Sequence, residues 1–172
     1  MELTRILTAG EKHFFAKTYN DVKLDNIAND LGIKKPSLYY YFKNKRDFYI
    51  QTLKFSMKSY TEALKVALWK KDFRAFVRRY LEYPSREHNL FAIAAQQWYG
   101  DDKEINTIIW LAEEGINKTI KVFLDTFHIT DIQKFLVLQL LDKLARENCT
   151  DTYCLEYSVE ELTDEIEKII MK

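Results

Sequence analysis

Residues 24–42 read LDNIANDLGIKKPSLYYYF, and this stretch decides the fold. It holds two short segments, near residues 24–31 and 35–41, separated by a turn that contains Gly32. Glycine suits such a turn because it accepts a positive φ without a Cβ clash. The apolar residues that would hold the two segments together are Ile27, Ala28, Leu31, Ile33 and Leu38. Two short helices around a glycine-containing turn predict a helix-turn-helix unit.

The second segment leaves a largely polar set of side chains facing outward. These residues are Lys34, Lys35, Pro36, Ser37, Tyr39, Tyr40 and Tyr41. Ammonium groups, hydroxyls and phenols are groups that bind phosphates and base edges. Three consecutive tyrosines cannot all lie in a core, because successive helix positions point in different directions. The segment therefore indicates a nucleic-acid partner.

The rest of the chain predicts further helices and no strand, because its apolar residues recur with a period of about 3.6. The expected helices lie near residues 2–17, 24–31, 35–41, 45–70, 72–83, 86–98, 102–127, 131–147 and 158–171. Pro84 and Ser85 are expected to begin the helix near 86–98, since proline disfavours helix in the residue before it and serine caps helices. Asn44, Asp101, Thr130 and Ser158 are expected to cap other helices. The sequence therefore predicts an all-α protein.

Charge is divided unevenly along the chain, although the formal net charge is zero. Residues 1–60 carry 11 Lys/Arg and 6 Asp/Glu, whereas residues 61–172 carry 15 and 20. A polyanion such as DNA should therefore contact the first third of the chain. The apolar runs are too short to span a bilayer and no export signal begins the chain, so we expect a soluble, cytoplasmic protein with no membrane partner.

Several kinds of active site have no signature in the sequence. The four glycines are too scattered to form a phosphate-binding loop. The three histidines lack metal-binding spacing, and Cys149 and Cys154 are expected to remain thiols in a reducing compartment. No nucleophile or pair of carboxylates is identified as catalytic. We therefore expect no metal, no cofactor and no enzymatic activity.

From Ile6 to about Leu53 the chain resembles the tetracycline-repressor (TetR) family of transcriptional regulators. The resemblance rests on ILTAG at 6–10, FFA at 14–16, Tyr19, the core residues around Gly32, and SLYYYFKNK at 37–45. The most specific part is Leu-Tyr-x-Tyr-Phe followed by x-x-Lys, which is the family's recognition helix and its junction to the next helix. The resemblance implies a helix-turn-helix DNA-binding domain over 1–47 and a helical effector-binding and dimerisation domain over 48–172.

The resemblance also implies a repressor that binds a palindromic double-stranded operator as a dimer under the control of a small-molecule effector. By position, the implied DNA contacts are Lys35, Pro36, Ser37 and Tyr39 in the groove, Lys34 and Tyr40 beside them, and Tyr41 and Lys45 on phosphates. Lys45 would lie in the first turn of a helix, where the helix dipole also attracts anions. Two residues depart from the family pattern: Thr18 replaces a glycine, and Lys23 replaces the usual Thr or Ser cap. Lys23 can still reach a phosphate, so it joins the expected DNA contacts.

The second half of the chain carries no motif but is rich in aromatic residues, most of which we expect in the core. Ligand pockets are mostly apolar with a few polar groups, so we expect a small apolar or aromatic effector among the helices over 72–127. Its expected contacts are Tyr80, Trp98 and Trp110. The helix over 45–70 would connect this pocket to the DNA, because it starts at Lys45 and ends at Trp69.

The last two expected helices have the pattern of a homodimer interface. Val159, Leu162, Ile166 and Ile169 form a narrow seam, and the helix over 131–147 has too wide an apolar band for one neighbour. An alternative reading is a helical ligand- or protein-binding module that no longer binds DNA. The cations between Lys34 and Arg46 favour DNA binding, because a domain that no longer binds DNA should lose such cations.

Overall fold

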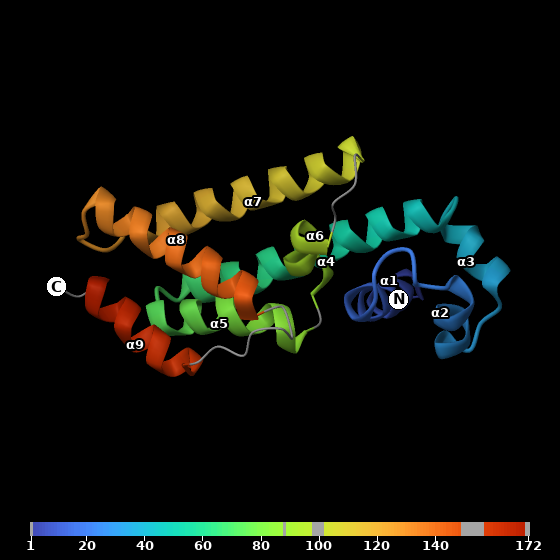
Figure 1. Cartoon of the computed structure of the whole chain (residues 1–172), viewed down its shortest axis with the longest axis horizontal. Helices are drawn as coiled ribbons and strands as arrows, with labels where there is room; N and C mark the ends of the chain where they lie inside the picture. Colours follow the sequence, from blue (N-terminus) through green and yellow to red (C-terminus); the bar gives the residue numbers. More distant parts are fainter. Residues whose placement is uncertain (1, 88, 98–101, 149–156, 171–172) are drawn as a thin grey trace.

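The computed structural model describes residues 2–87, 89–97, 102–148 and 157–170. Within these ranges it contains nine α-helices and no strand, in agreement with the predicted fold class (Figure 1). The helices are α1 (Glu2–Ala16), α2 (Leu24–Leu31), α3 (Lys35–Tyr41), α4 (Lys45–Trp69), α5 (Phe73–Arg86), α6 (Leu90–Gln97), α7 (Lys103–Leu124), α8 (Asp131–Asn148) and α9 (Val159–Ile170). The first three gather at one end of an elongated molecule, and α4 runs from them toward the other end (Figure 1).

The N-terminal head, by which we mean α1 to α3 and the first turns of α4, has its own apolar core. Side chains from all four helices are at most 2% exposed, namely Ile6, Phe14, Ile27, Leu38, Phe48 and Leu53. Helix α1 lies very close to α4 at Gly10, where an added Cβ would be 2.6 Å from Cζ of Phe48. Helix α2 packs on α1, and α3 packs on α2, so close packing of α1 on α4 helps to place both of them.

Helix α4 connects the head to the rest of the molecule. It begins after Asn44, whose side-chain oxygen accepts a hydrogen bond from the Asp47 amide at 2.8 Å, as the sequence predicts. The helix then packs against α1, α5, α6 and α7. Its buried residues continue beyond the head through Tyr60 and Leu64 to Ala67. The boundary expected at residue 47 therefore falls inside one continuous helix.

The prediction for Pro84 and Ser85 is wrong, because α5 continues through both residues to Arg86 and α6 begins at Leu90. A proline inside a helix leaves the carbonyl four residues earlier without its usual N–H donor. Here the Tyr60 hydroxyl of α4 donates to that carbonyl, Tyr80 O, at 3.2 Å. Three other predicted caps can be compared with the structure. Asp102 rather than Asp101 caps α7, whereas Thr130 and Ser158 accept hydrogen bonds from the Gln133 and Glu161 amides as expected.

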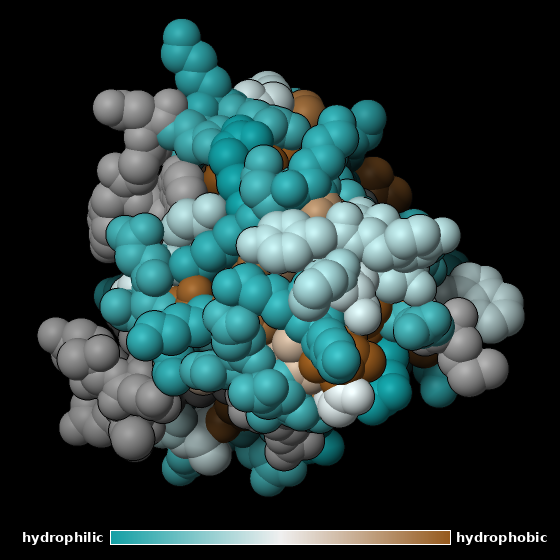
Figure 2. All heavy atoms as spheres, turned by 90° about the vertical axis from the view of Figure 1, so that its right-hand side faces the viewer, coloured by the Kyte–Doolittle hydropathy of each residue, from teal (hydrophilic) through white to brown (hydrophobic). Residues whose placement is uncertain are grey.

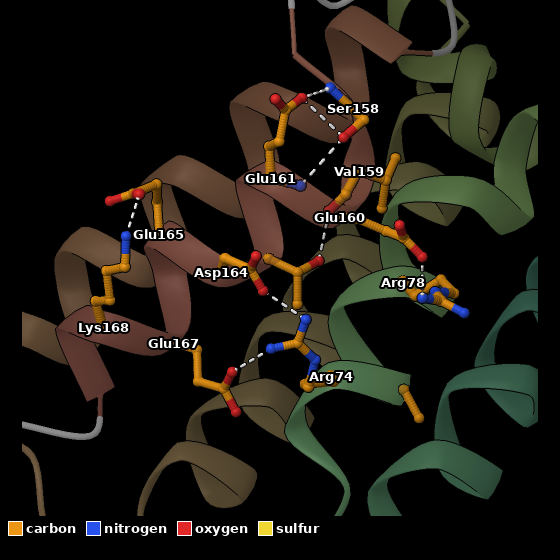
Figure 3. A network of polar contacts seen from close by, with 12 residues as sticks. Arg74, Arg78, Ser158, Val159, Glu160, Glu161, Asp164, Glu165, Glu167 and Lys168 are labelled. Carbon is orange, nitrogen blue, oxygen red and sulfur yellow. Dashed lines mark hydrogen bonds and ion pairs between the residues drawn. The ribbon is translucent and has the colours of Figure 1, made fainter.

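Helix α9 packs on α5 and α8 of the same chain. Ile166 and Ile170 are buried, and Val159 and Leu162 are half-buried against the same core. Ion pairs flank this apolar contact: Arg74 of α5 pairs with Asp164 and Glu167, and Arg78 pairs with Glu160 (Figure 3). The predicted seam of α9 is thus largely used within the subunit.

The aromatic residues divide between core and surface. Phe73, Phe76, Tyr80, Phe91 and Phe123 are buried as expected. Trp69 and Trp110 are exceptions and are 88% and 60% exposed. Among the described residues, none of the helices combines the length and apolar character that crossing a membrane requires.

Candidate functional site

The turn between α2 and α3 has the geometry that its sequence predicts. Gly32 has φ 67° and ψ 29°, which is the left-handed region that favours glycine. The Gly32 and Ile33 amides donate to the carbonyls of Asn29 at 3.0 Å and Ala28 at 2.9 Å, so the end of α2 is closed by its own backbone. Leu38 is 1% exposed and packs α3 against the head, which turns the opposite face of α3 outward.

The outward face of α3 carries the residues that the sequence assigns to DNA. Tyr39 is 47% exposed and Tyr40 is 84% exposed. Lys34, Pro36 and Ser37 are exposed as well, whereas Lys35 and Tyr41 are half-buried. Pro36 lies in the first turn of α3, where its missing N–H leaves no helix hydrogen bond unmade. The structure therefore brings the expected groove-facing residues to one surface.

Two side chains of α3 are held by carboxylates from other helices. The Lys35 ammonium lies 2.8 Å from Oδ2 of Asp25 in α2. This hydrogen bond raises the pKa of Lys35 and lowers the pKa of Asp25. The Tyr41 hydroxyl donates to Oε2 of Glu2 in α1 at 3.1 Å, and that bond raises the pKa of Tyr41. Both side chains therefore have intramolecular partners at the surface expected to meet DNA.

Lys45 and Lys23 are the two lysines outside α3 and its N-cap that the sequence assigns to phosphates. Lys45 is the first residue of α4, and its ammonium donates to the Asn20 carbonyl at 3.2 Å and lies 4.7 Å from the Tyr19 ring centroid. Burial lowers the pKa of Lys45. Lys23 is exposed and occupies the N-cap position of α2 without a side-chain capping bond. The departure at Lys23 thus leaves the first amides of α2 without the usual hydroxyl cap.

Figure 2 shows the molecule from the end that the head forms. Hydrophilic side chains cover most of this end, and the hydrophobic areas visible between them are small. A surface of this kind suits a charged and hydrated partner better than an apolar one.

Arg46 connects the head to α7, a contact that the sequence reading missed. Its guanidinium donates to both carboxylate oxygens of Asp102, at 2.6 and 2.8 Å, and to Glu104 at 2.8 Å. Asp102 also caps α7 by accepting from the Glu104 and Ile105 amides. The Arg46 hydrogen bond is the main reason that the pKa of Asp102 falls to about 2.

A second missed contact is buried between α1, α4 and α6. Glu11 is 7% exposed, and its carboxylate accepts hydrogen bonds from the Ser56 hydroxyl and the Leu90 amide. The Ser56 hydroxyl oxygen also accepts from the Phe91 amide at 3.0 Å, so both side chains cap the start of α6. Burial raises the pKa of Glu11. Glu11 shares a helix face with Leu7 and Phe14, and an acid on an apolar face was the available signal.

A cavity of about 530 Å³ lies among the helices beyond the head. Its lining residues are Tyr60, Tyr80, Phe91, Glu113, Glu114, Ile116, Asn117, Lys118, Lys121, Phe135, Leu138, Gln139, Asp142 and Ala145. Tyr80 lies where the sequence expects an effector contact. Trp110 does not line this cavity, and Trp98 lies outside the described residues. Helix α4 reaches the cavity through Tyr60, whereas Trp69 lines a separate groove.

The chain was compared with known protein families, curated proteins and solved structures. Residues 6–52 match the family model described as "Bacterial regulatory proteins, tetR family". No curated protein matches the chain. Several solved structures share its fold.

The fatty acid degradation regulator FadR from Bacillus halodurans has a TM-score of 0.71 at 15% identity, covering 98% of this chain and 97% of its own. FadR from Bacillus subtilis in complex with stearoyl-CoA has a TM-score of 0.71 at 16% identity, with the same coverage of 98% and 97%. A TetR-like transcriptional regulator from Rhodococcus sp. RHA1 has a TM-score of 0.70 at 17% identity, covering 98% and 92%. Residues 6–52 therefore form a TetR-family helix-turn-helix domain, and the chain has the fold of the TetR-family transcriptional regulators.

Proposed function

We propose that this protein is a transcriptional repressor that binds a palindromic operator through α3 and is controlled by a small molecule. The observation that carries the proposal is the exposed Lys, Ser and Tyr side chains on α3 of a TetR-family domain. Such groups bond base edges when a recognition helix enters the major groove. We infer no catalytic role for the chain. We expect it to act in the cytoplasm, where it would meet DNA.

The proposed DNA contacts fall into two classes. Lys34, Lys35, Pro36, Ser37, Tyr39 and Tyr40 would face the groove, and Lys23, Tyr41 and Lys45 would bind phosphates. Lys45 also lies in the first turn of α4, where the dipole of the helix favours an anion. The retained cations argue against the alternative of a binding module that no longer meets DNA.

The proposed homodimer uses α8 more than α9. On α8, Ile132, Phe135 and Leu136 are 73%, 60% and 51% exposed in the single subunit. Exposed apolar side chains grouped on one helix face favour burial against a partner. On α9, by contrast, Ile166 is fully buried within the subunit. We therefore assign the dimer contact mainly to the exposed apolar face of α8, and α9 packs against α8.

The proposed effector site is the cavity lined by Tyr60, Tyr80 and Phe91. Its lining combines aromatic and aliphatic side chains with polar and charged ones, which suits a ligand with an apolar body and a few polar groups. The Bacillus subtilis FadR structure, which contains stearoyl-CoA, supports a ligand of this amphipathic kind. The effector-binding unit would span residues 48–172, and the DNA-binding unit residues 1–47.

Two helices offer a route from this cavity to the DNA. Helix α4 lines the cavity at Tyr60 and begins at Lys45, and α7 lines it at Asn117 and Lys121 and is held to Arg46 through its cap. A ligand that shifts either helix would change the spacing of the two recognition helices in the dimer. Releasing the operator 100-fold requires about 2.7 kcal/mol of coupling.

Two variants test the proposed DNA contacts separately. Tyr39→Ala should reduce discrimination at particular base pairs, because it removes a groove-facing side chain. Lys45→Ala should weaken all sequences alike and reduce the slope of log affinity against log salt by about 0.9, as the loss of one phosphate contact predicts. The measurement is fluorescence anisotropy with duplex DNA at several salt concentrations. Equal slopes for wild type and Lys45→Ala would remove Lys45 from the phosphate contacts.

A ligand identified by thermal shift tests control by an effector. We expect operator titrations with that ligand to show a changed affinity. A ligand that stabilises the fold but leaves operator affinity unchanged would contradict ligand control, because it would bind both states equally.

A further inference from the structure

The ion pair between Lys35 and Asp25 lies at the surface proposed to meet DNA. Lys35 is the first residue of α3, and Asp25 is in the first turn of α2. The ammonium and the carboxylate oxygen are 2.8 Å apart, with the two side chains 41% and 60% exposed. A carboxylate at a surface that binds a polyanion lowers the affinity by repelling the phosphates. Its presence at this surface therefore calls for a functional explanation.

The neighbouring lysine is placed differently. Lys34 is exposed, and its ammonium forms no ion pair with any residue that the structure describes. The two adjacent lysines would therefore present different net charges to DNA. Lys34 offers a full positive charge, whereas Asp25 largely cancels the charge of Lys35 at long range.

This difference changes what each lysine can bind. A phosphate that approaches Lys35 must displace Asp25 or be repelled by it, so exchanging one anion for the other gains little. A base edge is neutral and does not face this repulsion. An ammonium has three donors, so Lys35 can keep Asp25 and still donate to the guanine O6 and N7 acceptors in the major groove.

We propose that Asp25 is a specificity-determining residue, which holds the Lys35 ammonium away from the phosphate backbone and directs it to a guanine edge. This inference rests on the proposed function, because it assumes that α3 enters the major groove. It goes beyond that function by assigning a role to a carboxylate that would otherwise only weaken DNA binding. Asp25 acts through Lys35 and therefore lowers non-specific affinity while raising the preference for the operator.

The test compares Asp25→Asn with Asp30→Asn. Both variants remove one carboxylate from α2, but Asp30 pairs with His13 of α1 and not with α3. Each is titrated by fluorescence anisotropy against a random-sequence duplex and against a duplex selected by the wild type, at several salt concentrations. Thermal unfolding monitored by circular dichroism shows that both variants are folded.

We expect Asp25→Asn to bind random DNA more tightly, with a salt slope steeper by about 0.9, because Lys35 gains a phosphate contact. The ratio of operator to random affinity should fall relative to Asp30→Asn. Adding Lys35→Ala should remove the extra slope in the Asp25→Asn background and change the slope little in the wild type. This double-variant comparison assigns the effect to Lys35 and not to net charge.

Three results would overturn the assignment of Asp25. The first is equal behaviour of Asp25→Asn and Asp30→Asn, the second is an unchanged ratio of operator to random affinity, and the third is an equal effect of Lys35→Ala in both backgrounds. A wild type that selects no sequence would instead overturn the proposed function, and the role of Asp25 with it. The selection step therefore distinguishes the two failures.

Discussion

Two glycines lie in helices but have opposite structural roles. Gly10 faces α4, and a Cβ there would be 2.6 Å from Phe48, which is fully buried. Gly115 is exposed on α7 and has no atom within 4 Å of the same position. The first glycine is needed for close packing, whereas the second only gives the unfolded chain extra freedom.

Substituting both glycines by alanine should therefore change stability in opposite directions. We expect Gly10→Ala to lower the free energy of unfolding by about 1–3 kcal/mol through overpacking. Gly115→Ala should raise it by about 0.5–1 kcal/mol, the usual advantage of alanine over glycine in a helix. Urea unfolding followed by circular dichroism measures both. A stabilising Gly10→Ala would show that α1 and α4 are not packed as closely as described.

Glu11 should make stability depend on pH. Burial raises its pKa in the folded state, so the folded protein disfavours the charged carboxylate, and Glu87 nearby adds to this effect. The stabilising effect of a protonated Glu11 is complete below the pKa of the unfolded chain. It is lost as the pH rises through the folded-state pKa.

Glu11→Gln removes this titration while keeping a side-chain oxygen that can accept hydrogen bonds. The unfolding free energy of Glu11→Gln relative to wild type should therefore increase from pH 4 toward neutral pH, as urea titrations across this range will measure. A difference that stays constant with pH would mean that folding does not raise the pKa of Glu11, which would contradict the burial of a carboxyl group at this position.

Which residues could be predicted from the sequence depended on how far away their partners lie. Gly32 and Leu38 act within one short motif, so their roles were readable from it. Arg46 and Glu11 contact residues 56 or more positions away, such as Asp102 and Asn89, and no local pattern records such pairs. The side chains expected to contact DNA lie on one surface around α3, but the partners of Lys35 and Tyr41 on other helices were not foreseen.

The helices themselves show the same division between local and distant causes. Starts defined by a local cap, such as those after Asn44, Thr130 and Ser158, were predicted correctly. The end of α5 was not, because its continuation through Pro84 involves a donor on another helix. Tyr60 lies 20 positions before the Tyr80 carbonyl that it satisfies.

Tyr60→Phe should therefore destabilise the protein by about 1 kcal/mol, the typical net value of a lost hydrogen bond. In a Pro84→Ala background the new N–H at position 84 can donate to the Tyr80 carbonyl. The cost of Tyr60→Phe should then be smaller, and chemical unfolding of the four proteins of this double-mutant cycle measures the difference. Equal costs in both backgrounds would mean that the Tyr60 hydroxyl does not compensate for the proline.

At the scale of the whole molecule, the proposed dimer predicts which exposed apolar residue contributes to dimer affinity. Leu136 on α8 and Leu111 on α7 are 51% and 55% exposed, so either can be changed without opening the subunit core. Leu136→Asp should raise the dimer dissociation constant at least tenfold by placing a charge in the interface. Leu111→Asp is the matched control and should leave it unchanged.

Light scattering at micromolar concentrations, without DNA, measures the mass of both variants and of the wild type. A monomeric wild type would exclude the dimer altogether. Equal effects of Leu111→Asp and Leu136→Asp would place the interface elsewhere than on α8. The exposure of α8 was not foreseeable in detail from the sequence, because its apolar band is wider than one neighbour can cover. Only the packing shows which part of the band α5, α6, α7 and α9 bury.

Sequence-specific binding by α3 is tested most directly by selecting DNA from a pool of random duplexes with the wild type and with Tyr39→Ala. The wild type should enrich an inverted repeat whose half-sites lie about one helical turn apart, or a multiple of it, because a two-fold dimer presents two copies of α3. Tyr39→Ala should enrich a degenerate version of the same repeat. Enrichment of no sequence by the wild type, or of the same sequence with equal strength by Tyr39→Ala, would contradict recognition through the outward face of α3.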